Sequence, residues 1–236
     1  MATPEHTPLG RGYENSLVYF HHVNDAWSFV AWSEKQCLGK DIIDLWTGDT
    51  PAHGLNNSRN CSQENQTGWD RCTYEDQLFA DRVYQTIRPD PKPFFVFWAP
   101  RVAHSPLEVP EQQLSHFSFI NDSARRYYHA MVYWVDEAIG NVTKQLKASG
   151  QWESTLLVLH ADNGGPIYYS GCCGGNNHPL KGGKLSNWDG GIRSSAFVSG
   201  GLLPSSVRGT KLTGLMAGWD WYYRCLTTSL RLSVHS

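Results

Sequence analysis

The stretch that decides the fold is residues 125–165, which read RRYYHAMVYWVDEAIGNVTKQLKASGQWESTLLVLHADNGG. Its first part has the periodicity of an amphipathic helix over 123–149, with apolar side chains recurring on one face. That face consists of Tyr127, Met131, Val135, Ala138, Ile139, Val142 and Leu146. Asp122 is a suitable N-cap and Gly150 a suitable stop, so the predicted helix has defined ends. The apolar run 155–159 that follows is typical of a buried strand.

Upstream of this stretch, a second strand and a second helix extend the pattern. Residues 94–99 read FFVFWA and are bounded by prolines, which predicts a buried central strand. Before it, the segment 74–87 has apolar residues spaced four apart and predicts another amphipathic helix. Strand, helix and strand in this order indicate a βαβ unit in a parallel sheet, and therefore an α/β fold. Such sheets bind ligands at the carboxyl ends of their strands, where Asp162 and Asn163 follow the second strand.

The composition excludes several classes of protein. The 236 residues carry 20 Lys and Arg against 22 Asp and Glu, a formal net charge of −2. A near-neutral chain lacks the charge attraction on which non-specific nucleic-acid binding depends. No apolar run approaches the roughly 18 residues that a membrane helix needs. We therefore expect no nucleic-acid partner and no integral membrane segment, and the oligomeric state stays open.

Cysteines and glycosylation triplets indicate the compartment. The six cysteines allow several disulfides, whose pairing the sequence leaves open. The triplet N-x-[ST] occurs at Asn56, Asn60, Asn65, Asn121 and Asn141. The first three lie close together in a stretch rich in Gly, Asn and Ser, as in an exposed loop of a glycoprotein. We predict a protein of the secretory pathway, lysosomal or extracellular, whose signal peptide is not present in this chain.

Three polar segments carry candidate chemistry. Asp162 and Asn163 offer the carboxylate and amide oxygens that hard cations such as Ca²⁺ prefer, although an Asx turn before the two glycines is the plainer interpretation. His104, just past the strand 94–99, is placed to bind an anion or transfer a proton, although most single histidines do neither. Lys184 and Arg193 flank a glycine-rich turn, where a cation can meet a tetrahedral oxyanion; solvated surface cations are the commoner case.

These segments, taken together and in order, resemble the sulfatase family. The resemblance is carried by FFVFWAPRVAHSPLEVP at 94–110, by the strand ending in DNGG at 162–165, and by GGNNHPLKGGKLSNWDGGIRSSAF at 174–197. It is greatest to the arylsulfatase B-like branch, includes ATPEHTPLGRGYE at 2–14, and covers roughly residues 2–221. It implies the alkaline-phosphatase-like fold, in which helices flank a mixed, mostly parallel sheet.

The resemblance also implies a division of the chain and a set of site residues. Residues 1–73 would be an irregular N-terminal segment of the sulfatase domain, 74–221 part of its catalytic domain, and 222–236 an unassigned tail. The family pattern makes Asp162 and Asn163 ligands of a Ca²⁺ cofactor. It makes His104 and Lys184 catalytic groups that contact the sulfate and assist departure of the alcohol. A cation and an ammonium aimed at developing negative charge act by electrostatic preorganisation.

The sequence departs from the family pattern at the nucleophile. Sulfatases oxidise the cysteine of C-x-[PA]-x-R to formylglycine, and none of the six cysteines here begins that motif. The early Asp-Asp pair that completes the family's Ca²⁺ site is also missing. We therefore expect a sulfuric ester hydrolase by family, acting on sulfate esters of small molecules or glycans, that is inactive as this isolated chain. We also expect the sheet to be incomplete at both ends, with strand edges and apolar faces exposed.

Two alternatives stay open at this point. A noncatalytic secreted protein of the same fold would bind sulfated glycans through Lys181, Lys184 and Arg193. A phosphoesterase of the same superfamily would act on phosphate rather than sulfate esters, although its two-metal sites want more His and Asp near the DN pair than the sequence has.

Overall fold

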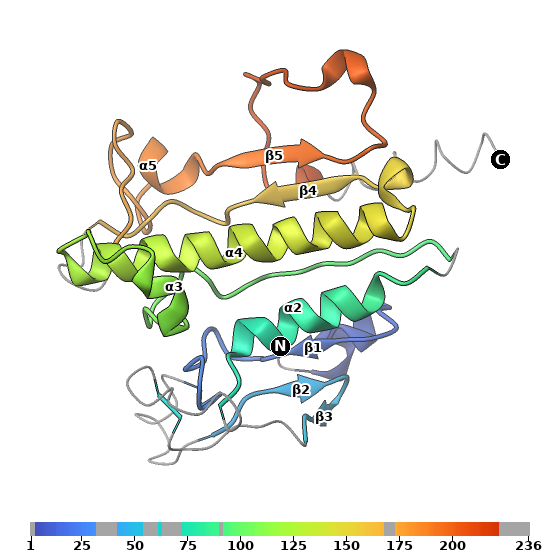
Figure 1. Cartoon of the computed structure of the whole chain (residues 1–236), viewed down its shortest axis with the longest axis horizontal. Helices are drawn as coiled ribbons and strands as arrows, with labels where there is room; N and C mark the ends of the chain where they lie inside the picture. The colour runs from blue at the N-terminus through green and yellow to red at the C-terminus, as the bar shows by residue number, and fades with distance from the viewer. Residues whose placement is uncertain are drawn as a thin grey trace.

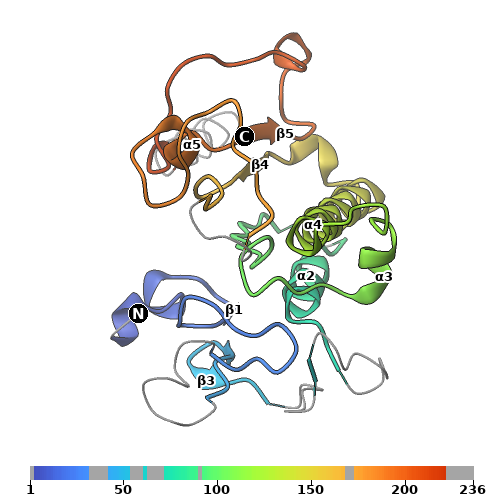
Figure 2. The same cartoon turned by 90° about the vertical axis from the view of Figure 1, so that its left-hand side faces the viewer.

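The computed structural model describes residues 3–31, 42–53, 61–62, 72–89, 92–167 and 173–221. The helices are α2 (Glu75–Thr86), α3 (Glu111–Ser115), α4 (Ser123–Ala148) and α5 (Asp189–Ile192). The strands are β1 (Leu17–Val18), β2 (Trp46–Thr47), β3 (Thr50–Pro51), β4 (Leu157–His160) and β5 (Ala196–Ser199). Single 3₁₀ turns are η1 (Pro4–His6), η2 (Leu9–Arg11), η3 (Trp152–Ser154) and η4 (Ser205–Val207). In Figure 1, α4 and α2 run across the middle of the molecule, with β4 and β5 above them and β1, β2 and β3 below; Figure 2 shows the same elements from the side.

The long helix α4 is as the sequence predicts. The Asp122 side chain accepts a hydrogen bond from the Arg125 backbone N–H at 2.7 Å, which satisfies one of the free donors of the first turn. The helix ends before Gly150, whose φ of +75° is the left-handed conformation that favours glycine. Its fully buried residues are Ala130, Met131, Trp134, Ala138 and Leu146. The helix is thus held by one apolar face and a defined cap.

Helix α2 packs against α4 and contributes to the same core. Ala80 of α2 lies in a buried cluster with Ala130, Met131 and Trp134 of α4. At the other end of the helix pair, Val83 clusters with Ile87 and with Leu146 of α4. The predicted helix over 74–87 is therefore confirmed, with Tyr74 as its N-terminal flanking residue. The core of the described chain lies between these two helices and the extended segments behind them.

The described strands form two small antiparallel sheets. One has the order β1-β2-β3, and the other pairs β4 with β5, with Leu157 opposite Ser199 and His160 opposite Ala196. The sequence predicts a parallel βαβ unit, but no parallel pair occurs among the described strands. The carboxyl end of β4 nevertheless leads directly into Asp162 and Asn163. A strand thus forms at 157–160 as expected, although its side chains are half-buried or exposed, and its expected parallel neighbour, 94–99, does not pair with it.

The expected central strand over 94–99 is extended but is neither buried nor paired. Within the described part of the chain, residues 93–100 make no backbone–backbone hydrogen bond. Val96 and Trp98 pack against the cluster between α2 and α4, whereas Phe95 is 66% exposed and Phe97 69% exposed. One face of the segment is therefore covered by helices and the other is open. The prediction of burial is wrong here because burial on both faces requires neighbours on both sides, which local sequence does not specify.

This open face leads to a prediction about solution behaviour. We expect the 236-residue chain to bind a fluorescent dye that reports exposed apolar surface, because the rings of Phe95 and Phe97 form an apolar patch in contact with solvent. The double variant Phe95→Asn, Phe97→Asn should lower the dye signal, whereas Phe119→Asn, at another exposed ring, should have a smaller effect. A cooperative thermal transition without dye binding by the parent chain would contradict this prediction.

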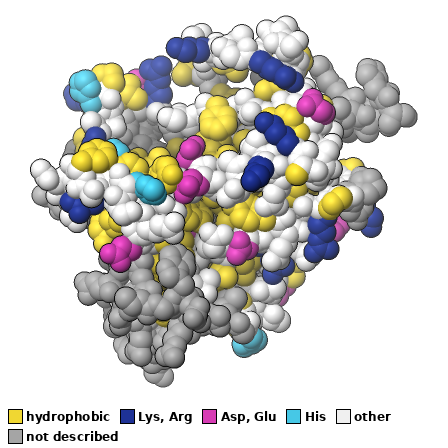
Figure 3. Space-filling view, viewed as in Figure 1, with side chains coloured by type: hydrophobic (Ala, Val, Ile, Leu, Met, Phe, Trp, Pro, Cys, Tyr) yellow, Lys and Arg dark blue, Asp and Glu magenta, His cyan; other side chains and the backbone are white. Residues whose placement is uncertain are grey.

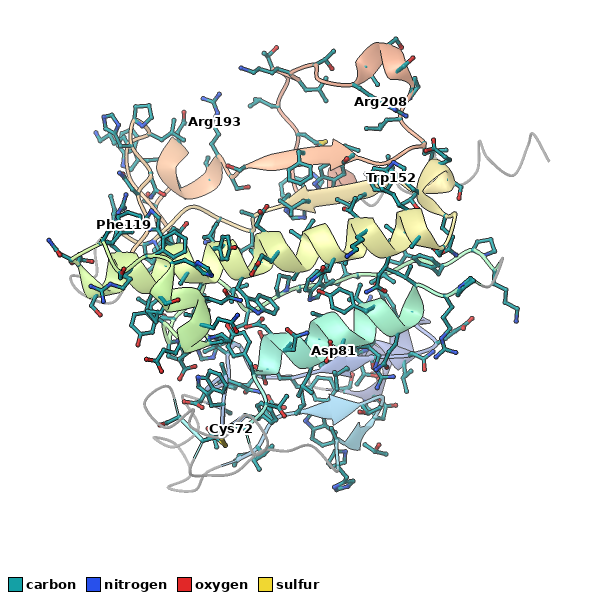
Figure 4. The ribbon with its side chains drawn as sticks, viewed as in Figure 1. Cys72, Asp81, Phe119, Trp152, Arg193 and Arg208 are labelled. Atoms are coloured by element: carbon teal, nitrogen blue, oxygen red, sulfur yellow. A yellow bond between two sulfur atoms is a disulfide. The ribbon has the colours of Figure 1, made fainter. Side chains whose placement is uncertain are left out.

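A disulfide between Cys61 and Cys72, with Cα atoms 5.7 Å apart, holds the chain just before α2 (Figure 4). Cys37, Cys172 and Cys225 lie outside the described residues, as do Asn56, Asn60, Asn65 and the tail 222–236. Asn121 and Asn141 are exposed. On the face drawn in Figure 3, Lys and Arg side chains are interspersed with Asp and Glu. No described helix combines the length and the continuous apolar sequence that a membrane span requires.

Candidate functional site

The site begins at the carboxyl end of β4. The backbone N–H of Ala161 donates to the Ser195 carbonyl at 2.9 Å and ends the ladder between β4 and β5. The chain then bends at Asp162, whose side chain is exposed, and at Asn163, which is half-buried. The Asn163 side-chain amide donates to the Gly164 carbonyl at 2.9 Å. Strand register therefore fixes where these two oxygen-bearing side chains lie.

Three pairs of adjacent glycines, at 164–165, 182–183 and 190–191, allow backbone segments to cross closely beside this bend. A Cβ on Gly164 would clash with the carbonyl oxygen of Gly190, and one on Gly190 would clash with that of Gly182. Gly182 itself has a φ of +78°, a conformation that side chains other than glycine rarely adopt. The glycines of this motif are thus required by contact between backbones. The result is a compact loop cluster that places residue 184 next to the end of β4.

Asn177 joins the parts of this loop cluster. Its side-chain oxygen accepts from the Gly165 N–H at 3.0 Å, and its amide nitrogen donates to the carbonyls of Gly165 at 2.8 Å and Gly182 at 3.0 Å. The Lys184 backbone N–H also donates to the Gly165 carbonyl, at 3.1 Å. The Lys184 backbone is therefore bonded to Gly165, which lies two residues after Asn163 in the sequence. Sequence reasoning missed the role of Asn177, because an Asn between glycines is typical of any loop.

A buried arginine holds the loop that carries His104 through hydrogen bonds to its backbone carbonyls. Arg101 is 4% exposed, and its guanidinium donates to the carbonyls of Pro106 at 2.8 Å, Glu108 at 3.2 Å and His104 at 3.4 Å. Its Nε lies 3.4 Å from the Asp76 carboxylate, which also accepts the Arg101 backbone N–H at 2.8 Å. These contacts fix the loop from 101 to 108 on the first turn of α2. Sequence reasoning missed this residue, although a charged residue two positions after an apolar strand was a usable signal.

Around this arginine lies a network of buried acids. Burial raises the pKa of Glu75 to about 8, although a hydrogen bond from the Asn24 amide to its carboxyl at 2.7 Å opposes the shift. Burial likewise raises the pKa of Glu108 to about 8, reinforced by the nearby charge of Asp25. Glu108 also accepts the Ala26 backbone N–H at 2.8 Å. The network therefore ties the N-terminal segment 24–26 to the His104 loop.

His104 and Lys184, which are 80 residues apart, are in direct contact. Lys184 Nζ lies 3.1 Å from His104 Nε2, and His104 Nδ1 lies 2.6 Å from the Ser105 carbonyl. A carbonyl oxygen only accepts, so the contact places the imidazole proton on Nδ1 and leaves Nε2 to accept from the lysine ammonium. Both side chains are half-buried. The pair thus offers one cationic donor and one nitrogen able to exchange a proton, side by side at the end of β4.

The other predicted cations lie elsewhere. Arg193, labelled in Figure 4, forms an exposed ion pair with Asp189 in which Nη1 and the carboxylate oxygen are 3.8 Å apart. Lys181 Nζ lies 3.9 Å from the centre of the Trp188 ring, an exposed cation–π contact. Both side chains thus have local partners. The structure brings His104 into contact with Lys184, whose backbone is bonded to Gly165 after β4, and leaves Lys181 and Arg193 on the surface of the loop cluster.

The bend after β4 supplies only part of a cation site. Asp162 and Asn163 have the carboxylate and amide oxygens that Ca²⁺ takes, but Ca²⁺ takes about 6–8 oxygen ligands. Among the described residues, no group of three or more His, Cys, Asp or Glu side chains is placed to hold a metal ion. The described residues therefore fit the cation in donor chemistry but do not complete its shell.

Comparisons with known proteins place this arrangement in a family. The sulfatase family model matches residues 21–206, which is most of the chain. The chain therefore belongs to the sulfatase family. The chain is similar in structure to the crystal structure of Ps i-CgsB in complex with k-i-k-neocarrahexaose, with a TM-score of 0.64 and 24% sequence identity. The match covers 83% of this chain and 41% of the Ps i-CgsB chain. The fold is thus of the alkaline-phosphatase-like α/β class.

Individual relatives share parts of the sequence. Arylsulfatase J of Mus musculus is 38% identical over 156 residues, which are 65% of this chain and 25% of that protein. N-acetylgalactosamine-6-sulfatase of Homo sapiens is 29% identical over 124 residues, 52% of this chain and 23% of that protein. The chain spans about a quarter of the length of the curated relatives it matches.

Proposed function

We propose that this chain binds the sulfate group of a sulfated small molecule or glycan at the His104 and Lys184 pair. The contact between Lys184 Nζ and His104 Nε2 is the observation that carries the proposal. It unites two residues that local structure holds independently, one through the Arg101 network and the other through the glycine-rich loop cluster. Among the described residues, the side-chain partner of this half-buried ammonium is an imidazole nitrogen and not a carboxylate, an arrangement that favours an anionic ligand.

In sulfate-ester hydrolysis these two groups have distinct tasks. The Lys184 ammonium would bind the sulfate oxygens and donate a hydrogen bond to the oxygen of the departing alcohol, where negative charge develops. His104 keeps its Nδ1 proton on the Ser105 carbonyl and uses Nε2 to hold or transfer a proton at the ester. Asp162 and Asn163 would be this chain's ligands to a Ca²⁺ ion, which when bound would neutralise sulfate charge.

Binding of a sulfate ester and its hydrolysis are separate questions for this chain. Since no cysteine begins the formylglycine motif, the isolated chain has no counterpart of the family's nucleophile. We propose that it binds sulfate esters without hydrolysing them. We also propose a secretory, lysosomal or extracellular location, which the disulfide between Cys61 and Cys72 supports.

Calorimetric titration of the chain with 4-nitrophenyl sulfate tests the proposal. We expect Lys184→Met to weaken binding at least ~10-fold, because a charge-assisted hydrogen bond to sulfate is lost. Lys181→Met is the matched control and should leave the affinity unchanged, since that ammonium lies over Trp188. Equal affinities of the parent chain and Lys184→Met would overturn the proposed site. Tighter binding of 4-nitrophenyl phosphate would instead favour a phosphoesterase, and release of 4-nitrophenol in the presence of Ca²⁺ would contradict the expected inactivity.

A further inference from the structure

A shallow groove lies where α2, α3 and α4 meet (Figure 1). Its volume is about 330 Å³, at the small end of the range of ligand pockets, which is about 300–1,000 Å³. Its lining includes Gln77 and Tyr84 of α2, Gln113 of α3, and Trp134, Gly140 and Asn141 of α4. The groove is therefore a feature of the helical layer that the proposed function does not use.

Contacts between the helices fix the shape of this groove. Tyr84 Oη donates to the Ala138 carbonyl at 3.2 Å, which links α2 to α4 within the lining. Trp134 is buried below the groove, and the side chains of Gln77 and Gln113 beside it are half-buried. Aromatic and amide side chains together suit a sugar, which has apolar C–H faces as well as hydroxyls that donate and accept hydrogen bonds.

A glycine in the middle of α4 keeps this groove open. Gly140 is exposed, and a Cβ built on it would meet no described atom within 4 Å, apart from the backbone of the helix itself. Packing in the described part of the chain therefore does not require a glycine at this position. Since glycine inside a helix is destabilising relative to alanine, the free space beside Asn141 has a cost in helix stability. Such a glycine favours an occupant that needs the space.

The residue that follows this glycine begins a glycosylation triplet, Asn141-Val142-Thr143. The Asn141 side chain is exposed and lines the groove. Residues two positions apart do not face each other on a helix, so Asn141 and Thr143 can be recognised together only while the chain is extended. A sugar would thus be attached before α4 forms, and the folded chain must then accommodate it. The groove beside Asn141 offers a place for it.

We propose that Asn141 carries an N-linked glycan whose first N-acetylglucosamine lies in this groove. The donor is a lipid diphosphate-linked oligosaccharide of the secretory pathway. The side-chain nitrogen of Asn141 bonds to C1 of the first sugar as the bond from C1 to the diphosphate oxygen breaks. The nitrogen loses a proton, and the lipid diphosphate leaves with the electron pair of the broken bond. This inference rests on the proposed secretory location and not on sulfate binding.

Expression of the 236-residue chain behind a cleavable signal peptide, in a eukaryotic cell, tests the attachment. Mass spectrometry should find a glycan on the peptide that contains residue 141, in chains from which the signal peptide has been removed. Thr143→Val keeps the asparagine but breaks the triplet, so it should abolish this glycan. The control Asn121→Gln removes the triplet that precedes α4 and should leave it in place. An unmodified Asn141 on processed chains would overturn the proposal.

Thermal unfolding tests whether the first sugar lies in the groove. An endoglycosidase trims each glycan to its first sugar, and the trimmed chain is compared with Asn141→Gln treated in the same way. We expect the trimmed chain to unfold at a midpoint about 2–4 °C higher, since the sugar contacts both α2 and α4. In a Gly140→Leu background the leucine fills the groove, and the difference should disappear. An equal difference in both backgrounds, or none in the parent, would show that the sugar lies elsewhere.

These outcomes are independent of sulfate binding. Asn141→Gln should bind 4-nitrophenyl sulfate as tightly as the parent chain does, because the lining of the groove includes neither His104 nor Lys184. An unmodified Asn141 would therefore leave the proposed sulfate site standing. A chain that carries the glycan but binds no sulfate ester would overturn the proposed function and leave this inference standing.

Discussion

Replacement of Arg101 by Met is expected to lower the free energy of unfolding by about 3–5 kcal/mol, since it leaves the buried Asp76 carboxylate without its charged partner. Asp76 is fully buried and lies 3.4 Å from Arg101 Nε. Three carbonyls of the loop 104–108 lose a donor at the same time. Urea denaturation of the 236-residue chain measures the change.

The matched control is Arg193→Met, which breaks an exposed ion pair with Asp189. Such pairs contribute less than about 1 kcal/mol, so this variant should unfold almost as the parent does. Similar losses for the two variants would show that Arg101 does not anchor the loop. Arg101 also positions His104, so Arg101→Met should bind 4-nitrophenyl sulfate more weakly than the parent chain under conditions where the variant is still folded. Arg101→Lys should recover only part of that affinity, since an ammonium lacks the planar, forked donor geometry of a guanidinium.

The second large effect is a fall in stability as the pH rises from about 5 to 8. In the folded chain the pKa of Glu75 is raised from 4.5 to about 8, so Glu75 keeps a proton that the unfolded chain releases. Stability therefore declines throughout this window, by about 1.4 kcal/mol per pH unit for one group. Glu108, with a pKa of about 8, adds a decline in the same direction. Urea midpoints at pH 5, 6.5 and 8 measure it.

Glu75→Gln isolates one of these groups, because the amide has the shape of the protonated acid and does not titrate. We expect the variant to show a clearly smaller fall between pH 5 and 8 than the parent, whereas Glu153→Gln at an exposed carboxylate should keep the parent profile. Below about pH 4 the dependence of stability on pH reverses, so that stability falls as the pH falls. The pKa of Asp25 is lowered, in spite of its burial, by hydrogen bonds from Glu108 and from Ser28, so the stability it contributes is lost as it gains a proton. A parent chain most stable near pH 8 would contradict this assignment.

The helices were predictable from sequence because their determinants are local. The cap at Asp122, the glycine after residue 149 and the apolar face of α4 are all encoded within that segment. The state of residues 94–99 was not predictable in the same way. Their composition demands an extended chain, and the structure has one, but pairing and burial depend on neighbouring strands that the described residues do not supply.

The site was predictable only in part. The contact between His104 and Lys184 follows from no local pattern, since it joins residues 80 apart, and it was expected only through the resemblance to the sulfatase family. Arg101 and Asn177 act by binding backbone carbonyls, a role that leaves little trace in residue type.

The glycine pairs beside the bend have a consequence for how this chain can change through evolution. Gly164, Gly182 and Gly190 meet backbone against backbone, so even a methyl group at these places would push the loops apart. Exposed or half-exposed side chains such as Asp162 and Lys184 can instead be exchanged without a steric penalty. Descendants of this chain should therefore exchange surface side chains one at a time while these glycines persist.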